Sequence, residues 1–382
     1  MNVYLDHAAS SPVRPEVAAA YADALGRVGN PASVHADGRA ARALLEDARE
    51  RLAAAADAHP TEVVFTAGGT ESVNLAVKGL TWNAGEGRDR IVTSPAEHHA
   101  TLDAAEWLAG RGTRVDLVPV DGAGRVRLDE LARVIEDGGT RNVAVLSLLW
   151  ANNEIGTIED TGAIADLAAE LGAPLHWDAV AAFGHVPMSF RRSGATAMSI
   201  SGHKLGAPIG TGALLVRRGA EPAALSHGGG QQSARSGTVD VAGAVALALA
   251  AEAAVEELDA EGERLRGLAT RLGEGIVRAV PDASLTGDAV DRLPGHLHAT
   301  IPGLLGETLL FVLDQAGFSV SVGSACRAGV AEPSHVLLAI GLDEVTARSA
   351  LRITLGRTST PADVDAFLAA LPAAVATARA AF

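Results

Sequence analysis

Apolar and polar positions alternate along the first part of the chain in a pattern that predicts strands separated by helices. The short apolar, β-branched runs are Glu62–Thr66, Arg90–Thr93, Arg114–Val118, Val143–Leu149, Pro174–Asp178, Ala197–Ser201 and Gly212–Val216. Most gaps between these runs carry apolar residues at helical spacing, as in Glu71–Leu80, His99–Ala109 and Ile164–Leu171. Strands that alternate with helices form a mainly parallel sheet covered on both faces. We therefore predict a large α/β domain built on a mainly parallel seven-stranded sheet.

The pattern changes near Val239, and the change predicts a second domain. An alanine-rich helical stretch continues to about Val280, and shorter predicted strands follow at His296–Ile301 and Leu351–Leu355. The chain has 382 residues, which is more than one hydrophobic core usually supports. We expect a large domain over residues 13–255 and a smaller α+β domain built from residues 1–12 and 256–382.

Composition and charge narrow the classes of function. The formal net charge of −15 argues against a broad nucleic-acid-binding face, which needs clustered lysine and arginine. The single cysteine, Cys326, excludes an internal disulfide. We recognise neither a signal peptide nor an uninterrupted apolar stretch of bilayer-spanning length. These features predict a cytoplasmic protein that binds neither nucleic acid nor a membrane.

Polar residues follow several predicted strands, where open α/β sheets bind their ligands. Gly69 and Thr70 open a helix after the first strand, and free N–H groups there suit a phosphate, although the same residues suit an ordinary helix cap. His98 follows the second strand, where it can stack on a ring, exchange protons or cap a helix. Asn152–Gly156 follows the fourth strand and is also typical of a turn. No set of residues has metal-ligand spacing, which argues against zinc.

Three further residues carry candidate chemistry. Asp178 ends the fifth strand, where a buried carboxylate needs a cation such as a protonated ring nitrogen, or a salt bridge or helix cap. Lys204 follows the sixth strand; there it is either a desolvated amine able to form a Schiff base or an ordinary exposed lysine. The string from Ser201 to Lys204 also matches S-x-x-K of serine acyl enzymes, but their partner motifs are missing. Cys326 is next to Arg327, which favours a reactive thiolate, whereas most free cysteines are buried and inert.

The order and spacing of the motifs resemble those of the cysteine desulfurases, which belong to the class V aminotransferase group of fold-type-I pyridoxal-phosphate enzymes. The segments that carry the resemblance are Tyr4–Ala9, Gly29–Ser33, Thr70–Ser72, Asn152–Gly156, Ser201–Lys204, Arg235–Thr238 and Gly323–Cys326. The resemblance covers nearly the whole chain. The Ser-Ala-Cys segment and the long loop before Glu332 are similar to the subgroup that serves iron–sulfur assembly and tRNA thiolation.

The resemblance implies pyridoxal 5′-phosphate as the cofactor and conversion of L-cysteine to L-alanine, with the sulfur left on Cys326 as a persulfide. Lys204 would hold the cofactor covalently, Asp178 would pair with its ring nitrogen, and His98 would stack on the ring and handle protons. The remaining ligands implied are Gly69, Thr70, Ser201 and His203 for the phosphate, Thr238 for the phosphate of the other subunit of a homodimer, Asn153 for the ring oxygen, and Arg352 with Asn30 for the substrate carboxylate. An iron–sulfur scaffold or a tRNA-thiolation enzyme would accept the sulfur.

Two segments depart from the family pattern. Ala181 stands where the family usually has glutamine, so a hydrogen bond to the cofactor's 3-oxygen would be lost or made by a water. The segment from Gly228 to Arg235 is one residue shorter than the family's and lacks an arginine. These departures keep two alternatives open. One is a different pyridoxal-dependent C–S lyase or aminotransferase, and the other is a weakly catalytic sulfur-handling scaffold.

Overall fold

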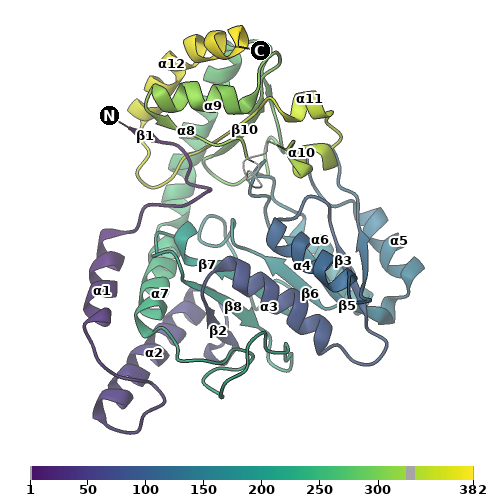
Figure 1. Ribbon diagram of the computed structural model, residues 1–382, viewed down its shortest axis with the longest axis vertical. Helices are drawn as coiled ribbons and strands as arrows, with labels where there is room; N and C mark the ends of the chain where they lie inside the picture. Colours follow the sequence, from purple (N-terminus) through teal and green to yellow (C-terminus); the bar gives the residue numbers. More distant parts are fainter. Residues whose placement is uncertain (1, 324–331, 382) are drawn as a thin grey trace.

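The computed structural model describes residues 2–323 and 332–381, so Cys326 and Arg327 lie outside the described residues. Two lobes follow one another along the long axis (Figure 1). The lower lobe contains a seven-stranded sheet, and the upper lobe contains a three-stranded sheet and a two-stranded one. The bounds of the two domains remain a prediction.

The seven-stranded sheet has the strand order β2-β8-β7-β6-β5-β3-β4. Its strands are β2 (Val63–Thr66), β3 (Arg90–Thr93), β4 (Arg114–Leu117), β5 (Val143–Leu149), β6 (Leu175–Asp178), β7 (Ala197–Ser201) and β8 (Gly212–Val216). Five neighbouring strands, from β7 to β4, are parallel, and β8 is antiparallel to both β7 and β2. The predicted α/β sheet is confirmed. The direction of β8 follows from its connection, because residues 202–211 link it to β7 without a crossover helix.

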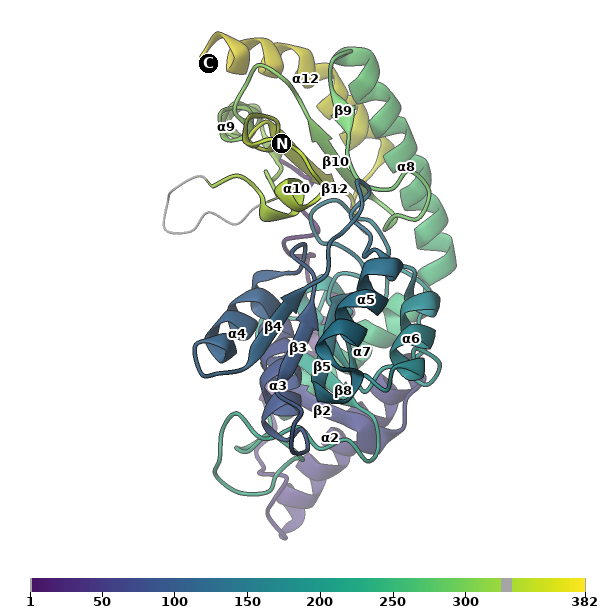
Figure 2. The ribbon, with the colours of Figure 1, turned by 90° about the vertical axis from the view of Figure 1, so that its right-hand side faces the viewer.

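Helices cover both faces of this sheet (Figure 2). They are α1 (Pro15–Leu25), α2 (Ala36–Ala55), α3 (Gly69–Trp82), α4 (His99–Ala109), α5 (Leu128–Gly138), α6 (Thr161–Glu170) and α7 (Val241–Glu256). Because successive strand residues point to opposite faces, Ile91 joins the apolar cluster under α3 and α4, while Val92 joins the larger cluster on the other face. Both faces of the central strands are thus buried, whereas the edge strand β4 is partly exposed, so the strand ends are where a ligand can reach the central sheet.

The upper lobe has its own apolar cluster, which joins Leu5 to residues between Leu265 and Ala378. Its elements are β1 (Val3–Tyr4), α8 (Leu258–Ala279), β9 (Ser284–Leu285), β10 (His296–Thr300), α9 (Gly306–Gln315), β11 (Phe318–Ser319), α10 (His335–Ala339), α11 (Glu344–Ala347), β12 (Ala350–Thr354) and α12 (Pro361–Ala380). Strand β10 pairs antiparallel with β12 and β9, and β1 pairs parallel with β11. The N-terminal strand therefore belongs to the upper lobe.

The predicted alanine-rich helical stretch is two helices, α7 and α8, which meet at Glu257. Figure 2 shows α8 rising from the end of α7 into the upper lobe. At the junction, the Glu257 carboxylate accepts hydrogen bonds from Arg14 Nη1 at 3.0 Å and Nη2 at 2.8 Å. Arg14 directly precedes α1, so this bidentate pair ties both chain segments that pass between the lobes.

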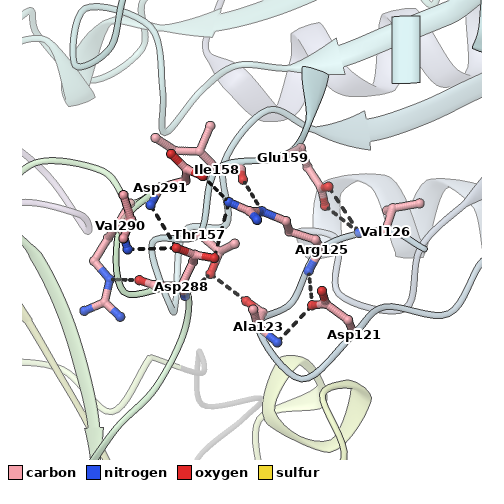
Figure 3. Close-up of polar contacts among 11 residues, drawn as sticks. Asp121, Ala123, Arg125, Val126, Thr157, Ile158, Glu159, Asp288, Val290 and Asp291 are labelled. Atoms are coloured by element: carbon pink, nitrogen blue, oxygen red, sulfur yellow. Dashed lines mark hydrogen bonds and ion pairs between the residues drawn. The ribbon is translucent and has the colours of Figure 1, made fainter. Parts of the chain in front are cut away.

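A polar network around Arg125 also joins the lobes (Figure 3). Arg125 Nη2 lies 2.6 Å from Asp291 Oδ2 and 3.3 Å from Asp288 Oδ2, and Arg125 Nε donates to the carbonyl of Ile158 at 3.1 Å. The Thr157 hydroxyl accepts from the backbone N–H of Asp288 at 2.9 Å. The network fixes the upper lobe against residues 157–158, which follow the predicted Asn152–Gly156 motif.

Helix α12 is long and apolar enough to cross a bilayer, although Asp363 and Asp365 interrupt its apolar residues. By length and composition it is the one such helix among the described residues. Its buried side chains, Val364, Phe367 and Leu371 among them, pack in the upper-lobe cluster, and the helix contacts α8 and α9. The apolar face of α12 therefore has a partner within the protein.

Candidate active site

Lys204 ends a single 3-10 turn, Gly202–Lys204, that directly follows β7. Its Nζ donates to the backbone carbonyls of Ala8 and, at 3.0 Å, of Ala9. Burial, and then the positive charge of Arg352, lower the pKa of Lys204 to about 8. The uncharged amine, which is the form that adds to an aldehyde, is therefore far more populated near neutral pH than in an ordinary lysine.

Asp178 ends the neighbouring strand β6, and only 2% of it is exposed. One carboxylate oxygen accepts from the backbone N–H of Val180 at 3.0 Å. Burial raises the pKa of Asp178 to about 6, while that hydrogen bond and the charge of Lys204 act in the opposite direction. Within the described part of the chain, Asp178 has no ion-pair partner, so the site fits a ligand that brings a cation.

His98 precedes α4 and caps it, because its Nδ1 accepts from the backbone N–H of Ala100 at 3.0 Å. Its side chain keeps solvent exposure, yet burial among protein atoms, together with the charge of Lys204, lowers the pKa of His98 to about 4. A neutral ring whose Nδ1 accepts a hydrogen bond carries its proton on Nε2. The capping and the proton-handling interpretations of His98 are therefore compatible.

The residues predicted to hold a phosphate meet at the start of α3. A Cβ at Gly69 would lie 2.7 Å from Val180 Cγ2 and 3.2 Å from Ser201 Cβ, so a larger residue would displace these side chains. The Ser201 hydroxyl is buried and has no hydrogen-bond partner among the described residues. The first N–H groups of a helix also lack intrahelical acceptors. A buried, unpaired hydroxyl beside a helix N-terminus fits a phosphate.

Two other residues predicted to bind the phosphate lie at this edge of the sheet. Thr70 is the next residue of α3 and is exposed. His203 lies between Ser201 and Lys204, and burial, with the charge of Lys204, lowers the pKa of His203 to about 4. His203 is therefore a neutral ring near neutral pH. Its role and that of Thr70 remain predictions.

Arg352, in β12 of the upper lobe, reaches the same region and is 5% exposed. Its Nη1 donates to the Asn153 carbonyl at 3.0 Å, and its Nη2 donates to Asp6 Oδ1 at 2.9 Å. Asn153 lies in the predicted turn, where the Asn152 side chain accepts from the backbone N–H groups of Glu154 and Ile155 at 2.9 and 3.1 Å. The motif is therefore a turn that presents one carbonyl to Arg352, and the role of Asn153 beside the ring oxygen remains a prediction.

The flanks of the cysteine segment meet at Glu154. The Ser334 hydroxyl donates to Glu154 Oε2 at 2.6 Å, and a Cβ at Gly323 would lie 3.2 Å from the same oxygen. Cys326 itself lies outside the described residues. Ser334 on one side of the cysteine segment is thus bonded to Glu154, and Gly323 on the other side lies close to it. The residue before Glu154, Asn153, contacts Arg352.

Asn30 and Thr238 do not join the group around Lys204 within one chain. Asn30 belongs to the loop that joins α1 to α2, two helices of the lower lobe (Figure 1). It is exposed, and its side chain accepts from the backbone N–H of Ala32 at 2.9 Å. Thr238 is exposed and lines a depression with Thr66. Their predicted roles would need a second subunit and remain predictions.

Several other sequence features have a structural explanation. His176 is a core residue, because its two ring nitrogens lie 2.8 Å from the hydroxyls of Ser147 and Ser199. Ala181 lines a small cavity beside Lys204, where the family's glutamine would stand. In the shortened segment, the Gln232 side chain pairs with the backbone N–H and carbonyl of Phe65 at 2.9 and 3.0 Å, at the edge strand β2.

Two contributions to the site were missed in the sequence. Asp6 stands in a recognised motif, but its partner Arg352 is 346 residues away. The carbonyls of Ala8 and Ala9 give no sequence signal because every residue has a carbonyl. An acidic residue in a recognised motif, with no assigned role, was the available clue.

A lysine of lowered pKa, an unpaired buried carboxylate and a phosphate-sized donor set are the groups that pyridoxal phosphate needs for its aldehyde, ring nitrogen and phosphate. On this α/β fold they define a fold-type-I pyridoxal-phosphate enzyme. The family model of the class-V aminotransferases matches residues 3–367.

Curated relatives and solved structures narrow the class. An IscS-like cysteine desulfurase of Mycobacterium tuberculosis is 48% identical over 98% of this chain and 97% of its own length. Cysteine desulfurase IscS of Methanosarcina thermophila is 39% identical over 97% and 91%. A solved NifS-like protein superposes with a TM-score of 0.91 at 32% identity, covering 99% of this chain and all of the other. The chain belongs to the class-V aminotransferase family, within which its relatives are cysteine desulfurases.

Proposed function

We propose that this protein is a cysteine desulfurase that converts L-cysteine to L-alanine and holds the released sulfur as a persulfide on Cys326. The observation that carries the proposal is the position of Lys204, an amine of pKa about 8, within electrostatic reach of buried Asp178 and Arg352. The names of the curated relatives support the reaction. A solved relative described as SspA in complex with cysteine, with 30% identity and a TM-score of 0.79, supports the substrate.

Each step of the reaction has a residue suited to it. Pyridoxal phosphate, when bound, supplies an electron sink for the negative charge that forms on the substrate's α carbon. Arg352 binds the substrate carboxylate through its guanidinium fork. Lys204, in its uncharged form, takes the α proton, and Asp178 keeps a charge beside the site of the ring nitrogen.

The sulfur leaves in a displacement that Cys326 performs. Its thiolate forms an S–S bond to the substrate sulfur while the C–S bond breaks. The electron pair of that bond passes to the carbon skeleton, which takes up a proton and becomes alanine. His98, neutral and with its proton on Nε2, is the group suited to exchange protons on the side of the site where α4 begins.

We further propose a cytoplasmic homodimer that delivers sulfur to an iron–sulfur scaffold or a tRNA-thiolation enzyme. The relatives named IscS and NifS support an acceptor protein. The exposure of Thr238 and Asn30, away from the group around Lys204, supports a site completed by a second subunit. Sedimentation of the holoenzyme should give the mass of two chains. A monomer that is fully active would contradict the homodimer.

The cofactor attachment has a direct test, because the sequence contains only two lysines, Lys78 and Lys204. Borohydride reduction of the holoenzyme should fix the pyridoxyl group on the peptide of Lys204. Lys78, whose Nζ lies 4.6 Å from the Trp107 ring, is the internal control. Labelling of Lys78 alone, or of neither lysine, would contradict the proposed site.

A further inference from the structure

The N-terminal segment is fixed against β12 next to Arg352. The backbone N–H of Thr354 donates to Leu5 at 2.8 Å, and the backbone N–H of Ala8 donates to the Thr354 hydroxyl at 2.8 Å. The Tyr4 hydroxyl donates to the Asp6 carbonyl at 2.9 Å. Asp6 lies between these contacts, so its backbone has a fixed position two residues along β12 from Arg352.

The guanidinium of Arg352 carries five N–H donors, of which two make hydrogen bonds with the described residues. Asp6 Oδ1 accepts from Nη2 and the Asn153 carbonyl accepts from Nη1. These two hydrogen bonds together fix the orientation of the guanidinium plane. Its Nε is buried and has no partner among the described residues. Asp6 is also the one acidic residue in an ion pair with Arg352 within the described ranges. A guanidinium whose plane is already fixed and whose Nε–H has no partner is preorganised to bind a carboxylate.

We infer that Asp6 is a positioning residue for substrate binding, which orients the Arg352 guanidinium for the carboxylate of L-cysteine. The inference rests on the proposed role of Arg352 as the carboxylate-binding residue. Asp6 itself need not touch the substrate. Its carboxylate acts by holding one guanidinium nitrogen, and a neutral acceptor of the same shape retains part of that effect.

The N-terminal segment that contains Asp6 also contacts Lys204, so the pKa of Lys204 gives a second way to observe the effect of Asp6. The carbonyls of Ala8 and Ala9 accept from Nζ, and the negative charge of Asp6 raises the pKa of Lys204 against burial and Arg352. Removing that charge should therefore lower the pH at which the Lys204 amine becomes reactive. A residue that acted only by packing would leave this pH unchanged.

The test compares holoenzymes carrying Asp6→Asn, Asp6→Ala, Arg352→Ala and the Asp6→Ala/Arg352→Ala pair. Asp6→Ala should raise KM for L-cysteine about tenfold, while kcat changes less, and Asp6→Asn should have a smaller effect because its amide oxygen still accepts. In the Arg352→Ala background, Asp6→Ala should have no further effect on KM. Asp282→Ala is the matched control, because it removes an exposed aspartate paired with Arg379 at 2.6 Å.

A second measurement does not depend on turnover. Cofactor-free Asp6→Asn should combine with pyridoxal phosphate with a pH profile displaced to lower pH relative to the parent chain, and Asp282→Ala should not. Asp6→Asn is nearly isosteric, so this measurement survives if Asp6→Ala does not fold.

The outcomes separate the two proposals. If Arg352→Ala leaves KM unchanged, the proposed role of Arg352 is wrong, and the inference falls with it. If Arg352→Ala raises KM but Asp6→Ala does not, the inference alone is wrong. A lower KM in Asp6→Ala would also overturn it, because Asp6 would then compete with the substrate for the guanidinium.

Discussion

Replacing Asp178 by asparagine will measure what the buried carboxylate costs the protein without its cofactor. Burial raises the pKa of Asp178 from 3.8 to about 6. The folded chain therefore binds this proton more tightly than the unfolded chain does, so ionisation of Asp178 destabilises the fold. At 1.36 kcal/mol per pH unit the full cost is about 3 kcal/mol above roughly pH 6. The cost shrinks as the pH falls and disappears below about pH 4, where both states are protonated.

The assay is urea unfolding of the cofactor-free parent chain and of Asp178→Asn at two pH values. Between about pH 5 and about pH 8 the variant should gain roughly 1–1.5 kcal/mol of unfolding free energy relative to the parent. The asparagine keeps the acceptor for Val180, and its added NH₂ group contributes an offset that is equal at both pH values, so the difference isolates the charge. A stability difference that is the same at both pH values would refute the reasoning.

The same substitution should have the opposite effect once the cofactor is bound. A carboxylate that costs free energy in the empty site is stabilised by a cationic ring nitrogen, whereas an amide is not. Asp178→Asn should therefore bind pyridoxal phosphate at least about tenfold more weakly, a loss of about 1.4 kcal/mol. Equal affinity in equilibrium titrations would show that Asp178 does not pair with the ring.

Three other substitutions or conditions give distinct outcomes. The rate at which the cofactor-free chain combines with pyridoxal phosphate should rise with pH and level off near pH 8, the pKa of Lys204; a rate still rising to about pH 10, as for an ordinary lysine, would contradict the burial argument. Gly69→Ala should weaken pyridoxal-phosphate binding more than binding of phosphate-free pyridoxal, because its Cβ would lie 3.2 Å from Cβ of Ser201, whose hydroxyl is the proposed phosphate donor; equal weakening of both ligands would remove Gly69 from the phosphate site. Ala181→Gln should change the cofactor's absorption spectrum and raise kcat by about twofold to tenfold through one added hydrogen bond; no change in either would mean that a water already makes that bond or that the glutamine belongs elsewhere.

The strands were predictable because each is a short apolar run between turn residues. Every observed bound of the seven-stranded sheet lies within one residue of the prediction, as for Val143–Leu149 and Ala197–Ser201. The direction of β8 was not predictable from its residues, since it depends on whether the connection crosses the sheet. The break at Glu257 was also missed, and the partner of Glu257 there, Arg14, is distant in the sequence.

The site residues likewise fall into those that the local sequence predicts and those that depend on distant contacts. Lys204 and Asp178 could be identified because strand ends of an α/β sheet converge, and a charged residue after an apolar strand is conspicuous. Contacts between distant segments could not be identified, since the pairings of Asp6 with Arg352 and of Glu154 with Ser334 join residues 346 and 180 positions apart. The pairing of the N-terminal segment with β12 brings the first two residues together, and the packing of α10 against the turn after β5 brings the second two together.

The most direct test of the account follows sulfur on the single cysteine of the chain, Cys326. Holoenzyme is mixed with L-cysteine without a reductant, and the protein and the small products are measured in the first turnover. The account predicts one alanine for each added sulfur atom, with that sulfur on the peptide of Cys326 and neither product from Cys326→Ala. Alanine formed with free sulfide at an unchanged rate in Cys326→Ala would contradict it and would mark the enzyme as a simple C–S lyase.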